Sequence, residues 1–149
     1  MNNLEETNLV EELVSTASGD VFVPKVQLIL VTHNPGDWLE EVLLGIAAQD
    51  YTSLDVTVID TKRRESIEEQ VKSILPESSI LHLKSSPGFS ALTPKNLDTA
   101  KNHLFYFFVT DDLVLDATAV RRVVESALEV NAGVAGLKVV GGENTELLQ

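Results

Sequence analysis

Two apolar segments that end abruptly in polar residues most constrain how this chain can fold. Their sequences are VQLILVTHN, residues 26–34, and LFYFFVTDD, residues 104–112. Apolar runs of this length, rich in Val, Ile, Leu and Phe, are typical of strands buried on both faces of a parallel sheet. The polar residues that follow each run are therefore expected at the carboxyl ends of strands, the edge at which open α/β sheets bind their ligands.

The second segment delivers two adjacent carboxylates, Asp111 and Asp112, to that edge. Two neighbouring anions repel each other unless water or a cation offsets the charge. Mg²⁺ and Mn²⁺ prefer oxygen ligands and bind through one or two carboxylates together with substrate phosphate oxygens. The pair therefore predicts a site that holds a divalent metal and, through it, a phosphate. The residues alone leave open the alternative that one Asp caps the local turn and both face water.

Composition and charge exclude several classes of protein. The chain has 149 residues, 44% hydrophobic and 23% charged, which predicts one soluble globular domain. It contains no cysteine, which excludes disulfides and thiolate metal sites. Its formal net charge of −12 argues against binding to nucleic acid and against docking on anionic lipid. No apolar stretch reaches the ~18 residues of a membrane span, and no signal peptide is recognised.

From residue 25 onward, strand and helix patterns alternate. Strands are predicted at Lys25–Thr32, Leu54–Asp60, Ile80–Leu83, Leu104–Thr110 and Gly133–Val140, and helices at Asp37–Gln49, at Glu65–Leu75 and from Asp116. Residues 90–102 are weakly helical. This alternation predicts an α/β fold with a mainly parallel sheet, right-handed crossovers and helices on both faces. Residues 1–24 are expected to be an acidic lead-in to a domain that spans 25–149.

Capping and spacing signals define the helix ends more closely. Asp37 and Asp116 are predicted to be N-caps, because a carboxylate can accept the free N–H groups of a first turn. Helical spacing of apolar residues places Trp38 in the first helix pattern and Leu128 on the core face of the last one.

Other polar residues also follow the predicted strands. Asp60 ends the second strand, where its carboxylate can accept a hydrogen bond from a nucleobase imide or a ribose hydroxyl; a turn Asp that bonds its own backbone is the alternative. His33 and its neighbours can line a base pocket, although a lone His is more often structural or merely exposed. Residues 62–64, Lys-Arg-Arg, are more simply a solvated face than a diphosphate site, and neither His82 nor His103 is assigned a role.

Taken together, these motifs resemble the N-terminal half of a family 2 glycosyltransferase with the GT-A fold. In that family a first strand ends in Thr-Tyr-Asn or similar and the next helix ends in Gln-x-Tyr, which match VTHN at 31–34 and QDY at 49–51. An Asp that contacts the base matches VID at 58–60, a Gly loop matches PGF at 87–89, and the Asp-x-Asp metal motif matches FVTDD at 108–112. The last helix and strand look most like large actinobacterial membrane glycosyltransferases of envelope polysaccharide assembly.

The resemblance implies an inverting, metal-dependent transfer of a sugar from a UDP-, dTDP- or GDP-sugar to a hydroxyl of a glycan or lipid-linked acceptor. Asp112 would ligate Mn²⁺ or Mg²⁺ bound to the donor diphosphate, and Asp111 would contact the ribose or a metal-bound water. Asp60 would read the base. The residues implied to contact the donor nucleotide are Thr32, His33, Asn34, Asp60, Gly88 and Asp111. A longer parent protein at the cytoplasmic face of a membrane is also implied.

The chain departs from the family pattern at several positions. Thr110 occupies the place of the first Asp of the metal motif, Thr61 opens a basic turn after Asp60, and Pro94 stands where an Asn is usual. The family supplies its catalytic base downstream of the metal motif, and no residue here is assigned that role. We therefore expect an incomplete donor-binding half that is inactive by itself. The alternative is a non-catalytic nucleotide-binding or scaffold module of the same fold.

Two other doubly wound classes fit poorly. Receiver domains carry their acidic pair after the first strand, whereas here the pair follows the fourth predicted strand. Nicotinamide-binding domains carry Gly-x-Gly-x-x-Gly after the first strand, where this chain has NPGD at residues 34–37.

Overall fold

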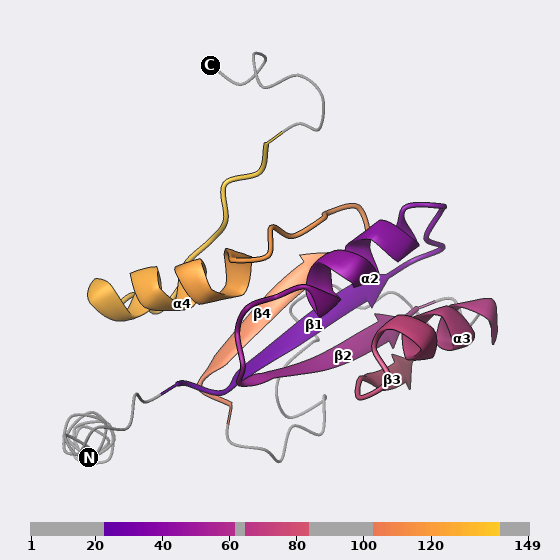
Figure 1. Cartoon of the computed structure of the whole chain (residues 1–149), viewed down its shortest axis with the longest axis horizontal. Helices are drawn as coiled ribbons and strands as arrows, with labels where there is room; N and C mark the ends of the chain where they lie inside the picture. The colour runs from indigo at the N-terminus through magenta and orange to yellow at the C-terminus, as the bar shows by residue number, and fades with distance from the viewer. Residues whose placement is uncertain (1–22, 62–64, 84–102, 141–149) are drawn as a thin grey trace.

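The computed structural model describes residues 23–61, 65–83 and 103–140. In chain order its elements are β1 (Val26–Thr32), α2 (Leu39–Ala47), β2 (Leu54–Asp60), α3 (Glu65–Ile74), β3 (Ser79–His82), β4 (Phe105–Thr110) and α4 (Ala119–Glu129) (Figure 1). The expected lead-in up to residue 22, the basic run 62–64, Gly88 and the weak helix at 90–102 lie outside the described residues.

The four strands form one parallel sheet in the order β3-β2-β1-β4. This confirms the predicted α/β class. The chain builds β2 and β3 on one side of β1 and then returns to place β4 on the other side. The carboxyl ends of β1 and β4 therefore flank the point at which the direction of winding reverses, the position where such sheets bind ligands.

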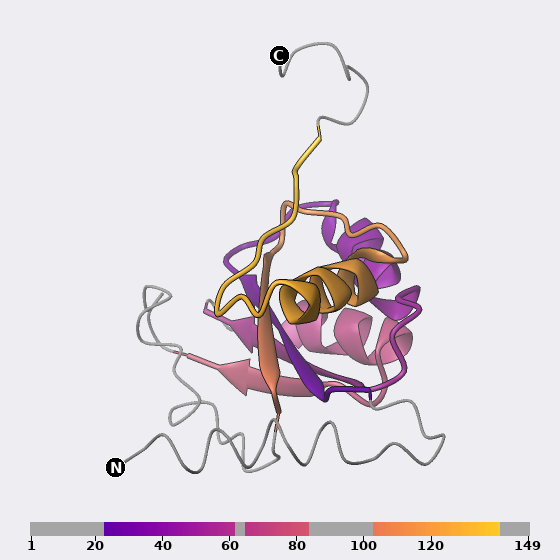
Figure 2. The same ribbon diagram turned by 90° about the vertical axis from the view of Figure 1, so that its left-hand side faces the viewer.

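The larger hydrophobic cluster lies on one face of the sheet. Strand residues such as Leu28, Leu30 and Val58 pack there against buried side chains of all three helices, and Figure 2 shows α2, α3 and α4 on the same side of the strands. Each fully buried Leu, Ile or Val stabilises the fold by roughly 1.5–3 kcal/mol relative to an exposed one. Their burial joins the three helices and the sheet in a single core.

A smaller cluster on the other face is centred on Ile29 and Ile59, with Leu81 and Tyr106 among the residues packed against it. Within the described residues, helices cover only the first face. The connection between β3 and β4, residues 84–102, lies outside them, so a helix on the second face stays a prediction.

The first helix starts later than its capping signal predicted. The N-cap of α2 is Trp38 and no side chain caps it, so the assignment of Asp37 was wrong. A backbone bond from Leu39 N–H to the carbonyl of Gly36, 3.3 Å, closes a turn that contains Asp37 and places it one residue before the cap. The side chain of Trp38 is 66% exposed and lies outside the core.

The last helix shows a related difference. The N-cap of α4 is Thr118, not Asp116. Oδ1 of Asp116 instead accepts bonds from the N–H of Thr118, 2.9 Å, and from its hydroxyl, 2.6 Å, so it organises the turn that leads into the helix. Leu128 is 50% exposed rather than buried, because Val124 and Ala127 already occupy the stripe that faces the core.

The fifth strand, expected at Gly133–Val140, is wrong for this structure. Those residues form no ladder with any described strand. The segment leaves α4 (Figure 1), and residues within 132–139 line a groove with β4 without pairing with it. Val134 is 92% exposed and Val140 62%. High strand propensity reflects how well a side chain packs on a pleated surface, and without a neighbouring ladder it does not create a strand.

No helix in the described part of the chain is both long enough and apolar enough to cross a lipid bilayer.

Candidate functional site

The candidate site is built where the ends of β1 and β4 meet. After β1 the backbone turns sharply, and Asn34 adopts a left-handed conformation with φ of 56°, which Asn tolerates better than most residues. The preceding N–H of His33 donates a hydrogen bond to Oδ2 of Asp111, 3.0 Å away. Residues that are far apart in the sequence are thus joined at the point where the direction of winding reverses.

A second set of contacts links the end of β1 to the end of β2. Nδ1 of His33 lies 2.7 Å from the hydroxyl oxygen of Thr61. The same hydroxyl donates to the carbonyl oxygen of Thr32 over 2.9 Å. Thr32 is itself fully buried, and its side chain donates to the carbonyl of Ile59 over 3.3 Å. Thr32 is therefore a buried residue that holds the ends of β1 and β2 together, whereas the neighbouring His33 is exposed.

Asp60 ends β2 in a fully buried position. Its Oδ2 lies 3.3 Å from Nδ1 of His82, its register partner on β3, although the ring is not aligned for a hydrogen bond. Nε2 of the same ring lies 3.6 Å from a carboxylate oxygen of Glu68 on α3. A buried carboxylate needs such partners because its charge has lost the solvation of water.

The two carboxylates after β4 differ in their surroundings. Asp111 is half-buried and accepts the bond from His33, whereas Asp112 is exposed. Oδ1 of Asp112 accepts a 2.5 Å hydrogen bond from the hydroxyl of Thr110, the residue in the first position of the metal motif. Within the described residues, neither carboxylate is paired with a basic side chain.

The donor set suits a metal that is completed by its substrate. No group of three or more His, Asp or Glu side chains within the described ranges is arranged to hold a metal by itself. Mg²⁺ and Mn²⁺ sites at phosphate-transfer centres use one or two carboxylates, with phosphate oxygens and water as further ligands. Asp111 and Asp112 fit that smaller set.

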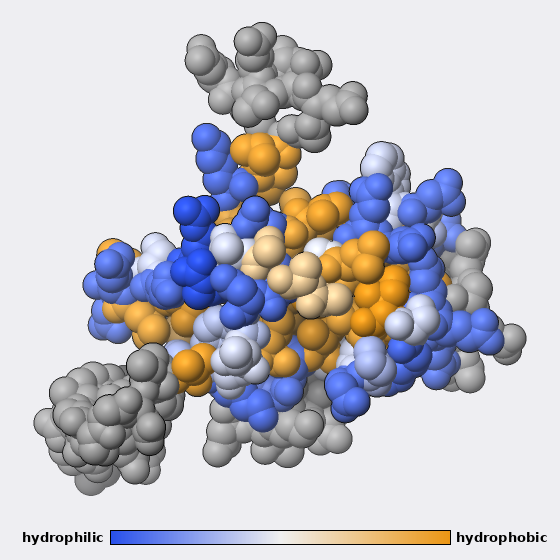
Figure 3. Space-filling view, in the orientation of Figure 1, coloured by the Kyte–Doolittle hydropathy of each residue, from blue (hydrophilic) through white to orange (hydrophobic). Residues whose placement is uncertain are grey.

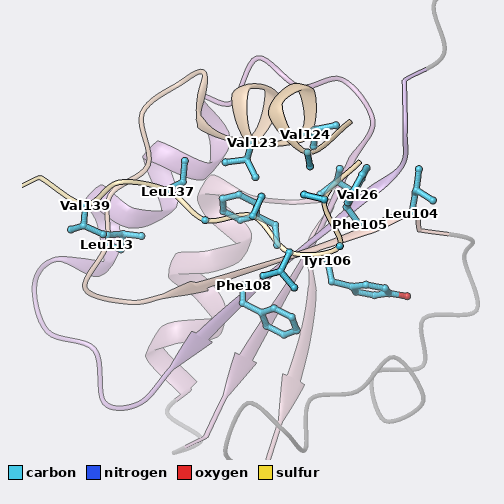
Figure 4. Close-up of a pocket in the computed structure, with 17 residues that line it drawn as sticks. Val26, Leu104, Phe105, Tyr106, Phe108, Leu113, Val123, Val124, Leu137 and Val139 are labelled. Carbon is cyan, nitrogen blue, oxygen red and sulfur yellow. The ribbon is translucent and has the colours of Figure 1, made fainter. Parts of the chain in front are cut away.

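A groove of about 820 Å³ opens beside Asp112. Its lining includes the exposed ring of Trp38 and two basic side chains, Arg122 and Lys138. Another groove, of about 550 Å³, lies between β4, α4 and residues 132–139; Figure 4 shows it lined by apolar side chains such as Phe105 and Val124, with none of the candidate residues. The groove at Asp112 also includes Glu41, Asp116 and several apolar residues, so it carries charged side chains of both signs, whereas the other groove is lined by none.

The sequence located part of this arrangement. The structure brings His33 to Asp111 as expected, leaves Asp112 exposed beside them and buries Thr32 and Asp60; Gly88 lies outside the described residues. Sequence reasoning missed the roles of Thr61 and His82. Both stand at strand ends, which is the one signal that could have drawn attention to them.

Comparison with known proteins bears on the fold. No protein-family model matches the chain, and no curated protein sequence matches it. Among solved structures, the chain is similar to residues 1–349 of S. aureus TarS in complex with UDP-GlcNAc, with a TM-score of 0.58 and 20% identity over 70% of this chain and 31% of that one. The same TarS segment without a named ligand gives a TM-score of 0.57 and 20% identity, covering 77% and 38% of the two chains.

TarS is a glycosyltransferase with a GT-A-like fold. The fold of this chain is of the same kind. A longer TarS structure agrees, with a TM-score of 0.55 and 20% identity over 76% of this chain and 23% of that one. The chain thus spans well under half the length of the TarS structures it matches. Identity at this level establishes the fold alone, and the chemistry has to be argued from the site.

Proposed function

We propose that this chain is the donor-binding part of a metal-dependent glycosyltransferase. The observation that carries the proposal is the hydrogen bond from His33 N–H to Asp111, which joins the end of β1 to the carboxylate pair after β4 in a glycosyltransferase fold. A carboxylate pair of the kind that binds Mg²⁺ or Mn²⁺, at the edge where open α/β sheets bind their ligands, supports the proposal.

The residues take the following roles in the proposal. Asp112 and Asp111 hold Mn²⁺ or Mg²⁺ together with the diphosphate of a UDP-, dTDP- or GDP-sugar. When bound, the metal stabilises the negative charge that builds up on the leaving diphosphate. Asp60 accepts a hydrogen bond from the base, which requires the side chains that now cover its carboxylate to move. The full set of donor contacts is Thr32, His33, Asn34, Asp60, Gly88 and Asp111.

In the reaction, the bond between the anomeric carbon and the diphosphate breaks and a bond to the acceptor oxygen forms. The proton of the acceptor hydroxyl passes to a general base, which must lie within hydrogen-bond reach of it. We assign this base to no residue of the chain. The finer features, namely family 2 membership, inversion, a glycan or lipid-linked acceptor in envelope synthesis and a location at the cytoplasmic face of a membrane, belong to the same proposal.

The proposal is tested by titrating UDP, dTDP and GDP into the purified chain by calorimetry, with Mn²⁺ and then with EDTA. We expect one nucleotide to bind only with metal, and binding to be lost in Asp112→Ala and Asp112→Asn, which remove the charge with and without a change of size. Asp37→Ala is the matched control, because it removes an exposed carboxylate from the turn before α2. A folded chain that binds no nucleotide, or binds equally well in EDTA, contradicts the proposal.

One observation favours the second candidate, a non-catalytic nucleotide-binding module. Thr110 stands at the first position of the metal motif, and its hydroxyl engages Asp112. Metal-dependent binding that is never followed by hydrolysis or transfer of the sugar, in the longest form of the protein that can be purified, would favour this module over the enzyme.

A further inference from the structure

The hydroxyl group of Thr61 contacts both the backbone of Thr32 and the ring of His33. Oγ1 of Thr61 lies 2.9 Å from the carbonyl oxygen of Thr32 and 2.7 Å from Nδ1 of His33, both within hydrogen-bond range. A hydroxyl has one proton to donate, so it can be the donor in only one of these two contacts.

One assignment places a proton in both contacts. If the hydroxyl donates to the carbonyl of Thr32, it can accept the proton of Nδ1–H, and each contact is a hydrogen bond. If it donates to Nδ1 instead, its oxygen faces the carbonyl oxygen at 2.9 Å with no proton between them. The carbonyl also accepts the N–H of Thr61 over 3.1 Å, which its two lone pairs allow. The neutral ring of His33 is therefore protonated at Nδ1.

This assignment leaves Nε2 of His33 as a bare acceptor. His33 is exposed, and within the described residues its contacts run only through its backbone N–H and Nδ1. The backbone bond to Asp111 and the ring bond to Thr61 hold the residue at both ends. Such tautomer control through the opposite ring nitrogen is how proteins commonly set what an imidazole can bind.

We propose that His33 is a specificity residue whose Nε2 accepts a hydrogen bond from an N–H or O–H group of the nucleoside half of the donor, and that Thr61 acts as its positioning residue. The inference rests on the proposed function, since it assumes that a nucleotide occupies the edge beside Asp111. In this neutral tautomer Nε2 carries no proton to donate to a phosphate oxygen, so the proposal assigns this form of His33 to the base or ribose and not to the diphosphate.

The tautomer can be measured independently of any ligand. In ¹⁵N-labelled protein, long-range ¹H–¹⁵N correlations at a pH where the ring is neutral identify the protonated nitrogen of His33. We expect Nδ1–H in the wild type and in Thr61→Ser, and loss of this preference in Thr61→Val, which keeps the shape but removes the hydroxyl. Thr57→Val is the matched control, because it removes a hydroxyl bonded to Gln27 from β2, the strand that leads to Thr61. A wild-type ring protonated at Nε2 overturns the proposal.

Binding measurements then test the role. We expect His33→Ala to weaken UDP and uridine by a similar factor, roughly 3- to 10-fold, which is the usual effect of one lost neutral hydrogen bond. Binding of pyrophosphate with Mn²⁺ should be unchanged. Thr61→Val should reproduce part of the loss, and Thr61→Ser should restore wild-type affinity. An equal loss for pyrophosphate would mean that His33 contacts the diphosphate and would overturn the proposal.

The two proposals fail in different ways. If the wild type binds nucleotide with metal but the His33 and Thr61 variants bind it equally well, the role of His33 is wrong and the donor site stands. If the folded wild type binds no nucleotide, the donor site and the role of His33 are both wrong.

Discussion

At the scale of single residues, the buried carboxylate of Asp60 lies beside the ring of His82. Asp60 is fully enclosed, and Nδ1 of His82 lies 3.3 Å from its Oδ2. Glu68 is the other carboxylate near the His82 ring. Its side chain is 57% exposed, so its interaction with the ring is screened by water and contributes little. A nucleobase that reaches Asp60 would compete with this pair, so the position of His82 bears on donor recognition.

Asp55, at the opposite end of the sheet, makes the stability of the fold depend on acidic pH. Burial acts to raise the pKa of its carboxyl, but hydrogen bonds from His103 and Lys25 outweigh burial and hold that pKa below the ordinary value of 3.8. The contacts measure 2.8 Å to His103 and 3.2 Å to Lys25. A carboxyl whose pKa is lowered by folding favours the folded state above its unfolded pKa, and this contribution is lost as the pH falls.

We therefore expect the free energy of unfolding to fall as the pH is lowered from about 5 through the unfolded pKa of 3.8 and below it. Urea denaturation at a series of pH values should show a shallower fall for Asp55→Asn than for the wild type. Asp37→Asn, a change at an exposed turn residue, is the control and should follow the wild type. Identical pH profiles for all three proteins would mean that Asp55 does not contribute.

At the scale of elements, α2 and α4 are joined by a side chain at the end of α2. The amide nitrogen of Gln49 donates to the carbonyls of Gly45, 3.0 Å, and Asp116, 2.7 Å, and its oxygen accepts the N–H of Val120, 3.0 Å. One side chain thus satisfies an otherwise unpaired N–H in the first turn of α4 and anchors the preceding loop. The Gln of the Gln-x-Tyr motif has a structural role in this chain.

Gly45 allows the close approach that this joint requires. A Cβ added at position 45 would lie 3.1 Å from the carbonyl oxygen and 3.2 Å from the nitrogen of Leu115. Both are backbone atoms, in a loop that Gln49 holds in place next to them at Asp116. Replacing a mid-helix Gly by Ala normally stabilises a helix by about 0.5–1 kcal/mol. Here the added methyl group would press against the backbone of Leu115, which offsets that gain.

We expect Gly45→Ala to lower the free energy of unfolding, by about 1 kcal/mol once the helix gain is offset by overpacking. Urea denaturation monitored by circular dichroism measures the change. Gly36→Ala is the control, since no atom lies within 4 Å of a Cβ placed there, and it should change stability by less than about 0.5 kcal/mol. A higher free energy of unfolding for Gly45→Ala would show that the loop at Leu115 can shift to accommodate the methyl group at little cost.

The elements also show what the sequence could specify. The ends of β1 and β2 at Thr32 and Asp60 follow from where apolar runs stop, and they agree with the structure. The strand expected at Gly133–Val140 was wrong because the segment makes no hydrogen-bonded ladder with β4, and the strand propensity of one segment does not determine whether it pairs. Likewise, Thr61 and His82 act through residues on adjacent strands, and register between strands is decided by the whole sheet.

At the scale of the whole molecule, exposed apolar side chains favour association between molecules, whereas the net negative charge disfavours it. The segment Gly133–Val140 and the outer part of α4 leave several large apolar side chains exposed, among them Val130, Val134 and Val139, and Figure 3 shows orange patches of this kind among the charged residues. Against this, 23 acidic and only 11 basic residues give a net charge of −12. Like charge keeps molecules apart, but it also destabilises the compact state of each one.

The charge imbalance makes a prediction about salt. The described ion pairs without a histidine, Lys25–Asp55 and the two made by Arg121 to Asp50 and Glu125, are all substantially exposed and each contributes little. Net repulsion should therefore dominate the electrostatics. Raising NaCl from about 10 to about 100 mM shortens the Debye length from ~30 to ~10 Å, so the free energy of unfolding should rise. Choline chloride at equal ionic strength should act equally, which separates screening from specific Na⁺ binding. A fall in stability with either salt would mean that the attractive pairs outweigh the excess negative charge.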